Sequence, residues 1–381
     1  MTFNFPLMFR MFFKSMVAYR ETGARFTVKR VFFVIFFPVL YFFHELVTWI
    51  CLLSDEIFFP EYRKVEVGRP LFIVGFPRSG TTYLHRIVDS DVNQFTSLKL
   101  WEILFAPSIL QKKFFLLTGK FDRLMGKPFY RLAIRLENRI FAGSRSMHKI
   151  SFFEAEEDEI ILIHIFSSLF QAFMFPFDEM NPFSRFDTDV SPAQRKTIMK
   201  FYQRCIQRHL YAFGPDKCFL SKNPVSSSKI NSIYETFPEA KIVCLVRQPL
   251  EAVPSAISFM SYGFRKFNAV DQAVINEKIF SLISHFYTYP LEQLSKRSED
   301  CGIIETYDML VRDPGAFVTN IYNRFGFDMS ESFQSLLDRE TRKIKNYSSR
   351  HAYSLDEYGL TAEQIVHYFK PIFDRFEFST G

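Results

Sequence analysis

The sequence predicts an α/β protein with a central parallel sheet that is buried on both faces. Helical stretches alternate with strand-like runs, most clearly at 193–213, where apolar residues recur at helical spacing. A glycine-containing loop follows the first run and leads directly into a further helix. Strands that alternate with helices are typical of a parallel sheet. Four short apolar runs are typical of strands that are buried on both faces: 71–74, 218–222, 240–247 and 302–307.

Length and composition agree with one large folded domain that carries an extension. The chain has 381 residues, of which 48% are hydrophobic and 23% charged, and this excludes disorder over most of its length. The five cysteines lie far apart and form no C-x-x-C pair, so they favour neither a disulfide framework nor a structural zinc site. We expect residues 1–65 to form a helical extension and residues 66–381 to form the main domain.

The extension has the composition of a membrane-binding segment. Six basic residues and one acidic residue lie among the first thirty, interleaved with phenylalanines, and they account for most of the formal net charge of +6. The remainder of the chain is nearly balanced in charge, which disfavours nucleic acid as a partner. The alternative is a basic helix that packs on its own domain.

Residues 31–53 are apolar and long enough to span a bilayer. Their only ionisable residues, His44 and Glu45, lie near the middle, where a glutamate is costly in lipid, and Pro38 predicts a kink. We therefore expect attachment to a membrane surface, with a spanning helix and a buried core helix as the alternatives. Isolated thiols favour the cytoplasmic face, whereas a spanning helix would place the main domain across the membrane.

The loop after the first strand is similar to a phosphate-binding loop that lacks its lysine. In FIVGFPRSGTTYL, residues 72–84, Gly75 and Gly80 occupy the glycine positions of G-x-x-x-x-G-K-[ST], and Thr81 stands where the lysine belongs. A strand, a glycine loop and a helix N-terminus together can hold an anion. The expected cradle residues are Arg78, Ser79, Gly80, Thr81 and Thr82.

This loop is poorly suited to magnesium-assisted phosphoryl transfer. That chemistry needs the loop lysine and an aspartate at the end of a second strand, but KIVCLV ends in Arg247. We therefore expect no metal, and a nucleotide whose phosphates are held by Arg78 and by hydroxyl groups. A P-loop kinase or NTPase is the alternative enzyme, and a membrane-bound nucleotide-binding protein without turnover is the alternative that is not an enzyme.

The linked motifs resemble those of sulfotransferases that use 3′-phosphoadenosine-5′-phosphosulfate (PAPS). PRSGTT after a buried strand resembles their 5′-phosphosulfate loop, and Arg247 followed eight residues later by Ser255 resembles their 3′-phosphate site. The resemblance to the diverse bacterial-type members continues over residues 56–378. It departs from their pattern at Gln248, which replaces an aspartate, and at Ser226, where many relatives carry a histidine.

The resemblance implies a P-loop-type three-layer fold and a set of roles for the donor side. Arg78 and the backbone of residues 79–82 would hold the 5′-phosphosulfate, while Arg247 and Ser255 would select the 3′-phosphate. Lys222, in a lysine-x-proline strand end, would steady the bridging oxygen. Sulfuryl transfer moves a group in line between two oxygens, so positioning and charge stabilisation should dominate the catalysis.

The acceptor hydroxyl needs a general base, for which the resemblance offers two candidates. Glu102 follows a short predicted strand at 94–98 and is narrowly favoured, and His148 precedes an acidic run at 154–159. This acidic run suits the start of a helix. The stretch that follows, 160–177, is apolar nearly all round and predicts a helix that is buried or lines an apolar pocket. Together with the phenylalanine-rich extension, it predicts a lipophilic alcohol as acceptor.

Overall fold

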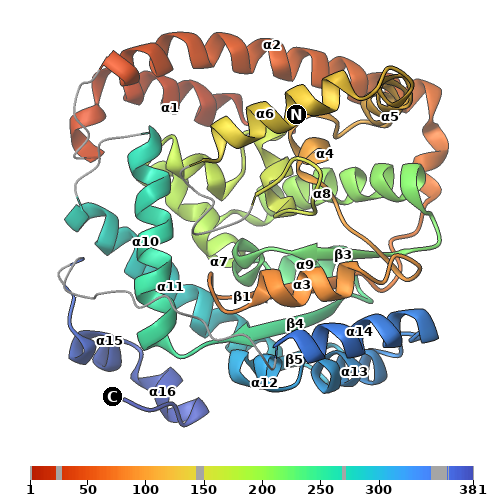
Figure 1. Cartoon of the computed structure of the whole chain (residues 1–381). Helices are drawn as coiled ribbons and strands as arrows, with labels where there is room; N and C mark the ends of the chain where they lie inside the picture. Colours follow the sequence, from red (N-terminus) through yellow and green to blue (C-terminus); the bar gives the residue numbers. More distant parts are fainter. Residues whose placement is uncertain are drawn as a thin grey trace.

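Five parallel strands form the central sheet of this computed structural model, in the order β2-β3-β1-β4-β5 (Figure 1). The structure describes residues 2–22, 28–142, 150–267, 272–344, 358 and 360–380. The four strands predicted from apolar runs are confirmed, with bounds that shift by one or two residues at most. The strands are β1 Leu71–Gly75, β2 Phe95–Thr96, β3 Cys218–Lys222, β4 Lys241–Val246 and β5 Gly302–Thr306.

Side chains of the strands alternate between two apolar clusters, one on each face of the sheet. On β1, Phe72 and Val74 enter the larger cluster, and Leu71 and Ile73 enter the smaller one. Helices α3, α13 and α14 cover the smaller cluster, while α8, α9, α10 and α11 contribute to the larger one. Helices therefore cover both faces, and the predicted three-layer α/β fold is confirmed.

The regular helices account for most of the remaining chain. The α-helices are α1 Phe5–Val17, α2 Val28–Phe58, α3 Thr81–Asp89, α4 Leu100–Phe105, α5 Ile109–Leu124, α6 Pro128–Ile140, α7 Phe186–Asp189, α8 Pro192–Phe213, α9 Ile230–Thr236, α10 Pro249–Phe267, α11 Gln272–Ser295, α12 Tyr307–Arg312, α13 Pro314–Phe325, α14 Glu331–Ile344, α15 Ala362–Tyr368 and α16 Lys370–Phe376. The 3₁₀ helices are η1 Tyr19–Thr22, η2 Pro60–Lys64, η3 Asp158–Ile165, η4 Leu169–Phe173, η5 Asp178–Arg185 and η6 Pro224–Ser228.

The predicted continuous helix at 160–177 is wrong. The segment instead forms η3 and η4, which are separated at Phe166, a residue with a left-handed backbone (φ 52°). The Ser168 hydroxyl then accepts a hydrogen bond from the Phe170 amide (3.2 Å) and starts η4. The prediction that this apolar stretch is buried or lines a pocket is confirmed, because Ile161, Ile165 and their neighbours lie in the larger cluster.

Helix α2 lies along the main domain, and its Glu45, Thr48 and Asp55 side chains are buried there. Met11, Tyr41 and Leu52 from the first two α-helices join the larger cluster. The Trp49 indole donates to the His164 carbonyl oxygen (3.0 Å), and the Glu45 carboxylate contacts the His164 ring (3.0 Å). Although residues 31–58 are long and apolar enough to cross a membrane, the helix therefore has one face that is fixed to protein.

Two further features connect this layer to the rest of the fold. The Asp55 carboxylate, fully buried, accepts from the Ile109 amide (2.8 Å) and the Leu110 amide (3.0 Å) at the start of α5, and pairs with Arg208 on α8 (3.0 Å). The predicted boundary near residue 65 falls between η2 and β1, but the helices before it share a core with the helices after it. The α1–α2 layer is thus built onto the domain.

Candidate active site

The loop between β1 and α3 lies where the strand order reverses, at the carboxyl end of the central strand. β1 pairs with β3 on one side and with β4 on the other, so a crevice forms beyond its end. Arg78 (φ 73°) and Gly80 (φ 87°) both have left-handed backbones, and α3 begins at Thr81. Successive amides in such a turn point inward and favour an anion.

Gly80 is required at its position for steric reasons as well. A Cβ atom there would lie 2.6 Å from the Tyr307 ring, closer than real contacts allow. The fully buried Ser79 fixes the turn from inside, because its hydroxyl donates to the Phe76 carbonyl oxygen (2.6 Å). The loop is therefore held in shape by the protein itself.

The second half of the predicted site lies directly against the loop. The Arg78 Nε donates to the Ser255 hydroxyl (2.9 Å), and the Arg247 Nη1 donates to the Arg78 carbonyl oxygen (3.1 Å). Arg247 follows β4 and Ser255 lies on α10, so the fold brings together residues that are more than 160 positions apart in the chain. The geometry joins the two motifs in one site.

Two neighbours hold the Arg247 side chain in place, and a third holds its backbone. Its guanidinium lies over the Tyr307 ring (4.3 Å to the centroid), and its Nε and Nη2 both donate to Glu251 (2.9 and 2.7 Å). The Tyr287 hydroxyl donates to the Arg247 carbonyl oxygen (2.7 Å). A guanidinium fixed in this way matches the bidentate geometry of a phosphate group.

Lys222 lies at the end of β3, in register with Ile73 of β1. Its side chain is almost fully buried, and its ammonium donates to the Glu157 carboxylate (3.1 Å). Next to this pair, burial raises the pKa of the Glu156 carboxyl to about 7, although the Lys222 cation opposes the shift. The Lys222 cation therefore meets two acids of the 154–159 run, a stretch that by itself predicted only a helix start.

Glu102 has a different setting from the one expected of a base. Its carboxylate is 1% exposed and contacts the His209 Nδ1 (2.8 Å) and the Lys112 ammonium (3.3 Å). It also accepts from the Lys99 amide (3.1 Å), which closes the first turn of α4. Burial alone would raise the pKa of Glu102, but His209 and Lys112 outweigh it and hold the pKa at about 2. The carboxylate is thus enclosed by these partners in the structure.

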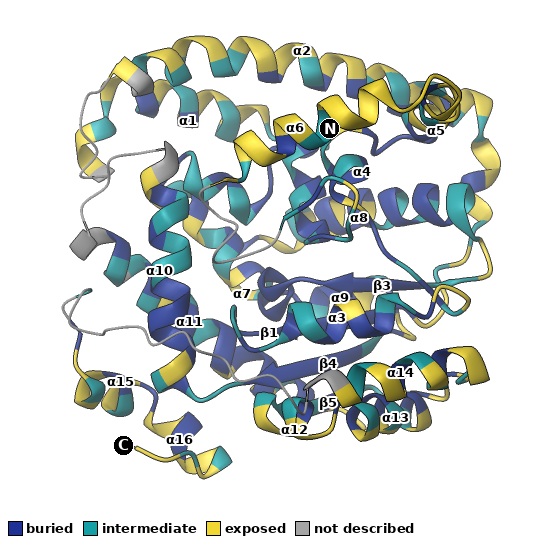
Figure 2. Ribbon diagram, viewed as in Figure 1, coloured by how far each residue is buried: buried dark blue, intermediate teal, exposed yellow. Residues whose placement is uncertain are grey.

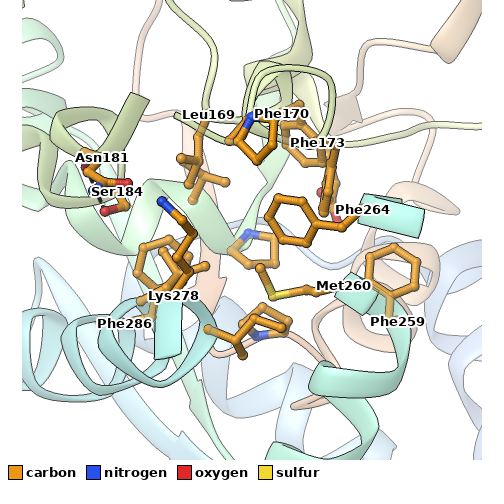
Figure 3. Close-up of a pocket in the computed structure, with 18 of the residues that line it drawn as sticks. Leu169, Phe170, Phe173, Asn181, Ser184, Phe259, Met260, Phe264, Lys278 and Phe286 are labelled. Atoms are coloured by element: carbon orange, nitrogen blue, oxygen red, sulfur yellow. Dashed lines mark hydrogen bonds between the residues drawn. The ribbon is translucent and has the colours of Figure 1, made fainter. Parts of the chain in front are cut away.

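An apolar cavity of about 110 Å³ opens beside the loop (Figure 3). Its walls come from η4, η5, η6, α10 and α11, and Pro77 of the loop and Glu157 also line it. Glu157 and Lys278 are the ionisable residues in its described lining, and Lys278 pairs with Asp178 (2.7 Å). The aromatic and aliphatic residues that Figure 3 labels around it are Leu169, Phe170, Phe173, Phe259, Met260, Phe264 and Phe286.

Sequence reasoning placed the donor-side residues close together but missed Glu157. The sequence of the acidic run EEDE, residues 156–159, does not indicate which carboxylate reaches the cavity, because this depends on the turn into η3. The other candidate base, His148, lies outside the described residues. Gln248, a departure from the family pattern, donates to the Ser379 carbonyl oxygen (2.6 Å), and Ser226 is buried in η6.

Comparison with known proteins finds sulfotransferases. The omega-hydroxy-beta-dihydromenaquinone-9 sulfotransferase Stf3 of Mycobacterium bovis is 26% identical over 356 residues, which cover 89% of this chain and 84% of the relative, and the Mycobacterium tuberculosis protein of that name matches equally. The crystal structure of sulfotransferase STF9 from Mycobacterium avium shares the fold, with a TM-score of 0.70 and 20% identity over 88% of this chain and 84% of that one. Sulfotransferase STF1 from Mycobacterium tuberculosis does so with a TM-score of 0.66 and 20% identity, covering 95% and 90%.

The family assignment rests on the sequence as well as on the fold. The sequence model of the sulfotransferase family matches residues 70–331, which run from the start of β1 to the start of α14 and include the loop, Lys222, Arg247 and Ser255. PAPS is the general sulfuryl donor of this family. The chain therefore belongs to the sulfotransferase family and is a sulfuryl-transferring enzyme.

Proposed function

We propose that this sulfotransferase moves a sulfuryl group from PAPS to the hydroxyl of a lipophilic alcohol. The observation that carries the proposal is the apolar cavity beside the loop between β1 and α3, which Glu157 lines. A polar sugar would find few hydrogen-bond partners on such walls, whereas an apolar alcohol loses its contact with water there.

On the donor side, the loop and the Arg247 pair would hold the two ends of PAPS. Arg78 and the amides of residues 79–82 are placed to bind the 5′-phosphosulfate at the start of α3. Arg247 and Ser255 are placed to bind the 3′-phosphate. Arg78, Arg247 and Lys222 would supply the positive charge for the phosphates, so we expect the donor site to work without a metal.

The transfer step follows from the positions of Lys222 and Glu157. As the acceptor oxygen bonds to sulfur, the bond from sulfur to the bridging phosphate oxygen breaks, and the Lys222 ammonium stabilises the charge that develops on that oxygen. The acceptor proton must go to a base, and Glu157 lines the cavity 3.1 Å from the Lys222 ammonium. We therefore assign the base to Glu157 in preference to Glu102, whose carboxylate is enclosed by His209 and Lys112.

The size of the cavity limits how much of the acceptor can enter. About 110 Å³ holds a group of roughly benzene size. A long lipid would place only its hydroxyl end in the cavity, and the rest would stay outside. The printed name of the mycobacterial relative describes a hydroxylated menaquinone as its substrate, which supports a lipophilic class for this chain without naming the molecule.

A lipid acceptor requires an enzyme that works at a membrane, and α1 and α2 fit this requirement. We propose that they attach the enzyme to the membrane surface, with the domain on the cytoplasmic side. A span is disfavoured because Glu45 and Asp55 on α2 are bound by His164 and Arg208 of the domain.

The decisive experiment is a screen of lipid, steroid and carbohydrate alcohols with labelled PAPS. Transfer to apolar alcohols dispersed in vesicles is expected, and exclusive transfer to small polar sugars would contradict the proposed acceptor class. Stabilisation against heat by 3′-phosphoadenosine-5′-phosphate (PAP), with a chelator present, tests the donor site separately.

A further inference from the structure

Helices α5 and α6 form a hairpin that is exposed over nearly its whole length. In α5 the buried residues are Ile109, Lys112 and Asp122, and in α6 the one buried residue is Glu137. At the turn between them, Leu124 is 84% exposed. A helix at the surface of a water-soluble protein normally turns a wide apolar stripe toward its core. This hairpin keeps its apolar side chains outside instead.

The exposed surface of the hairpin is also strongly cationic. On α6, cations recur every fourth residue beside a row of exposed leucines, so the two rows run along the helix next to each other. No described carboxylate forms an ion pair with these cations. The exposed cations of the hairpin are Lys113, Lys120, Arg123, Lys127, Arg131, Arg135 and Arg139.

The two acidic residues of the hairpin are both turned inward. The Asp122 carboxylate accepts from the amides of Phe129 (2.7 Å) and Tyr130 (3.0 Å) at the start of α6. The Glu137 carboxylate accepts from the Ser151 hydroxyl and the Phe152 amide (3.0 Å each). The outer surface therefore combines apolar side chains and cations without any exposed acid.

The hairpin lies on the same side of the molecule as α1 and α2, and α2 contacts α5 (Figure 1). Figure 2 shows exposed residues along the outer sides of α2, α5 and α6. Elsewhere in the described chain, exposed large apolar side chains are few, namely Val92, Phe105, Phe153, Met309 and Tyr368. The four helices thus form one apolar face, and the hairpin adds its cations to the basic residues that precede α2.

We propose that the α5–α6 hairpin binds the surface of an anionic lipid bilayer. Its apolar side chains enter the acyl boundary, and its cations lie at the level of the lipid phosphates. Charge complementarity favours this occupant over a second copy of the chain, because a two-fold contact through this face would bring the same cations against each other. The proposal goes beyond the proposed attachment through α1 and α2, since it adds lipid selectivity, and it does not depend on the identity of the acceptor.

The test measures flotation of the full-length protein with vesicles of phosphatidylcholine alone and of phosphatidylcholine mixed with phosphatidylglycerol. The variant is Arg131→Gln/Arg135→Gln/Arg139→Gln. The matched control, Lys296→Gln/Arg339→Gln/Arg342→Gln, removes the same charge from exposed positions after α11 and on α14. Each cation near an anionic bilayer strengthens binding roughly fivefold, so the first variant should bind anionic vesicles on the order of a hundredfold more weakly.

Binding to neutral vesicles should stay near the wild-type level in both variants, and the control should keep its preference for anionic vesicles. Unchanged anionic binding by the first variant, or an equal loss in the control, would overturn the proposal. So would a wild-type dimer in solution that the first variant no longer forms. Heat stabilisation by PAP reports folding and donor binding independently, so a failed sulfuryl transfer would not be confused with a failed membrane contact.

Discussion

Replacement of Arg247 by alanine tests the donor site most directly. In the structure its guanidinium already stacks on the Tyr307 ring, so part of its orientation is set before a 3′-phosphate binds. Two charge-assisted hydrogen bonds contribute roughly 1.5–3 kcal/mol each. Since the side chain must give up its contact with Glu251, the lower total of about 3 kcal/mol is appropriate. Arg247→Ala should therefore raise the KM for PAPS by on the order of a hundredfold.

The assay measures the affinity of the enzyme for PAP and for adenosine 5′-monophosphate, which lacks the 3′-phosphate. The wild-type enzyme should prefer PAP, and Arg247→Ala should lose most of this preference while its kcat at saturating PAPS falls much less. Arg297 provides a matched control, because its guanidinium lies over the Tyr234 ring at a similar distance (4.1 Å) near the opposite end of the sheet. If Arg247→Ala keeps the wild-type ratio of the two affinities, the assignment of the 3′-phosphate site is wrong.

Four other substitutions test the acceptor side and the buried acids. Glu157→Gln should lower kcat by on the order of a hundredfold or more with little change in the KM for PAPS, whereas Glu102→Gln should mainly destabilise the fold, by about 3–5 kcal/mol in chemical denaturation. Gly263→Ala should raise the acceptor KM by roughly tenfold, because its Cβ would lie 2.8 Å from the Phe173 ring and push that ring into the cavity. Folding raises the pKa of Glu156 from 4.5 to about 7. Between pH 4.5 and about 7 the folded chain therefore keeps a proton that the unfolded chain releases. As the pH rises through this range, the contribution of Glu156 to the free energy of unfolding falls. In Glu156→Gln this fall in the free energy of unfolding, up to roughly 3 kcal/mol, should be absent, so the free energy of unfolding should depend less on pH than in the wild type.

Each of these predictions has an outcome that contradicts it. A stable Glu102→Gln protein with lost turnover, next to an active Glu157→Gln protein, would return the base to Glu102. An unchanged acceptor KM in Gly263→Ala, with PAP binding intact, would place the acceptor outside the cavity. An unfolding curve whose pH dependence is the same with and without Glu156 would mean that another group causes it.

The strands and the glycine loop could be predicted because their signals are local. A run such as KIVCLV indicates a strand buried on both faces by its own composition, and the glycine loop needs only its flanking strand and helix. The pairing of the loop with Arg247 came instead from the resemblance to sulfotransferases. In the structure the two meet because β1 and β4 are parallel neighbours whose carboxyl ends lie at the same edge of the sheet.

The acceptor side could not be predicted in the same way, because it depends on partners far away in the chain. The burial of Glu102 is set by His209, 107 positions later, and a sequence window around Trp101 contains no sign of it. The break at Phe166 depends on a left-handed residue within an apolar run, which composition does not reveal. The α5–α6 hairpin has a pattern that looks amphipathic, but the pattern does not say that both the apolar and the cationic rows stay exposed.

During synthesis, α2 is made long before the residues that hold it to the domain. Glu45 finds His164 only 119 residues later, and Asp55 finds Arg208 only 153 residues later. At about 5–20 residues per second, the ribosome needs on the order of ten seconds to make the first of these partners. During that interval the nascent chain carries a long apolar helix whose acids lack their partners in the domain. A chaperone or a bilayer surface that shields it in this interval would prevent aggregation, and the two unpaired carboxylates would oppose its insertion as a span before the domain folds.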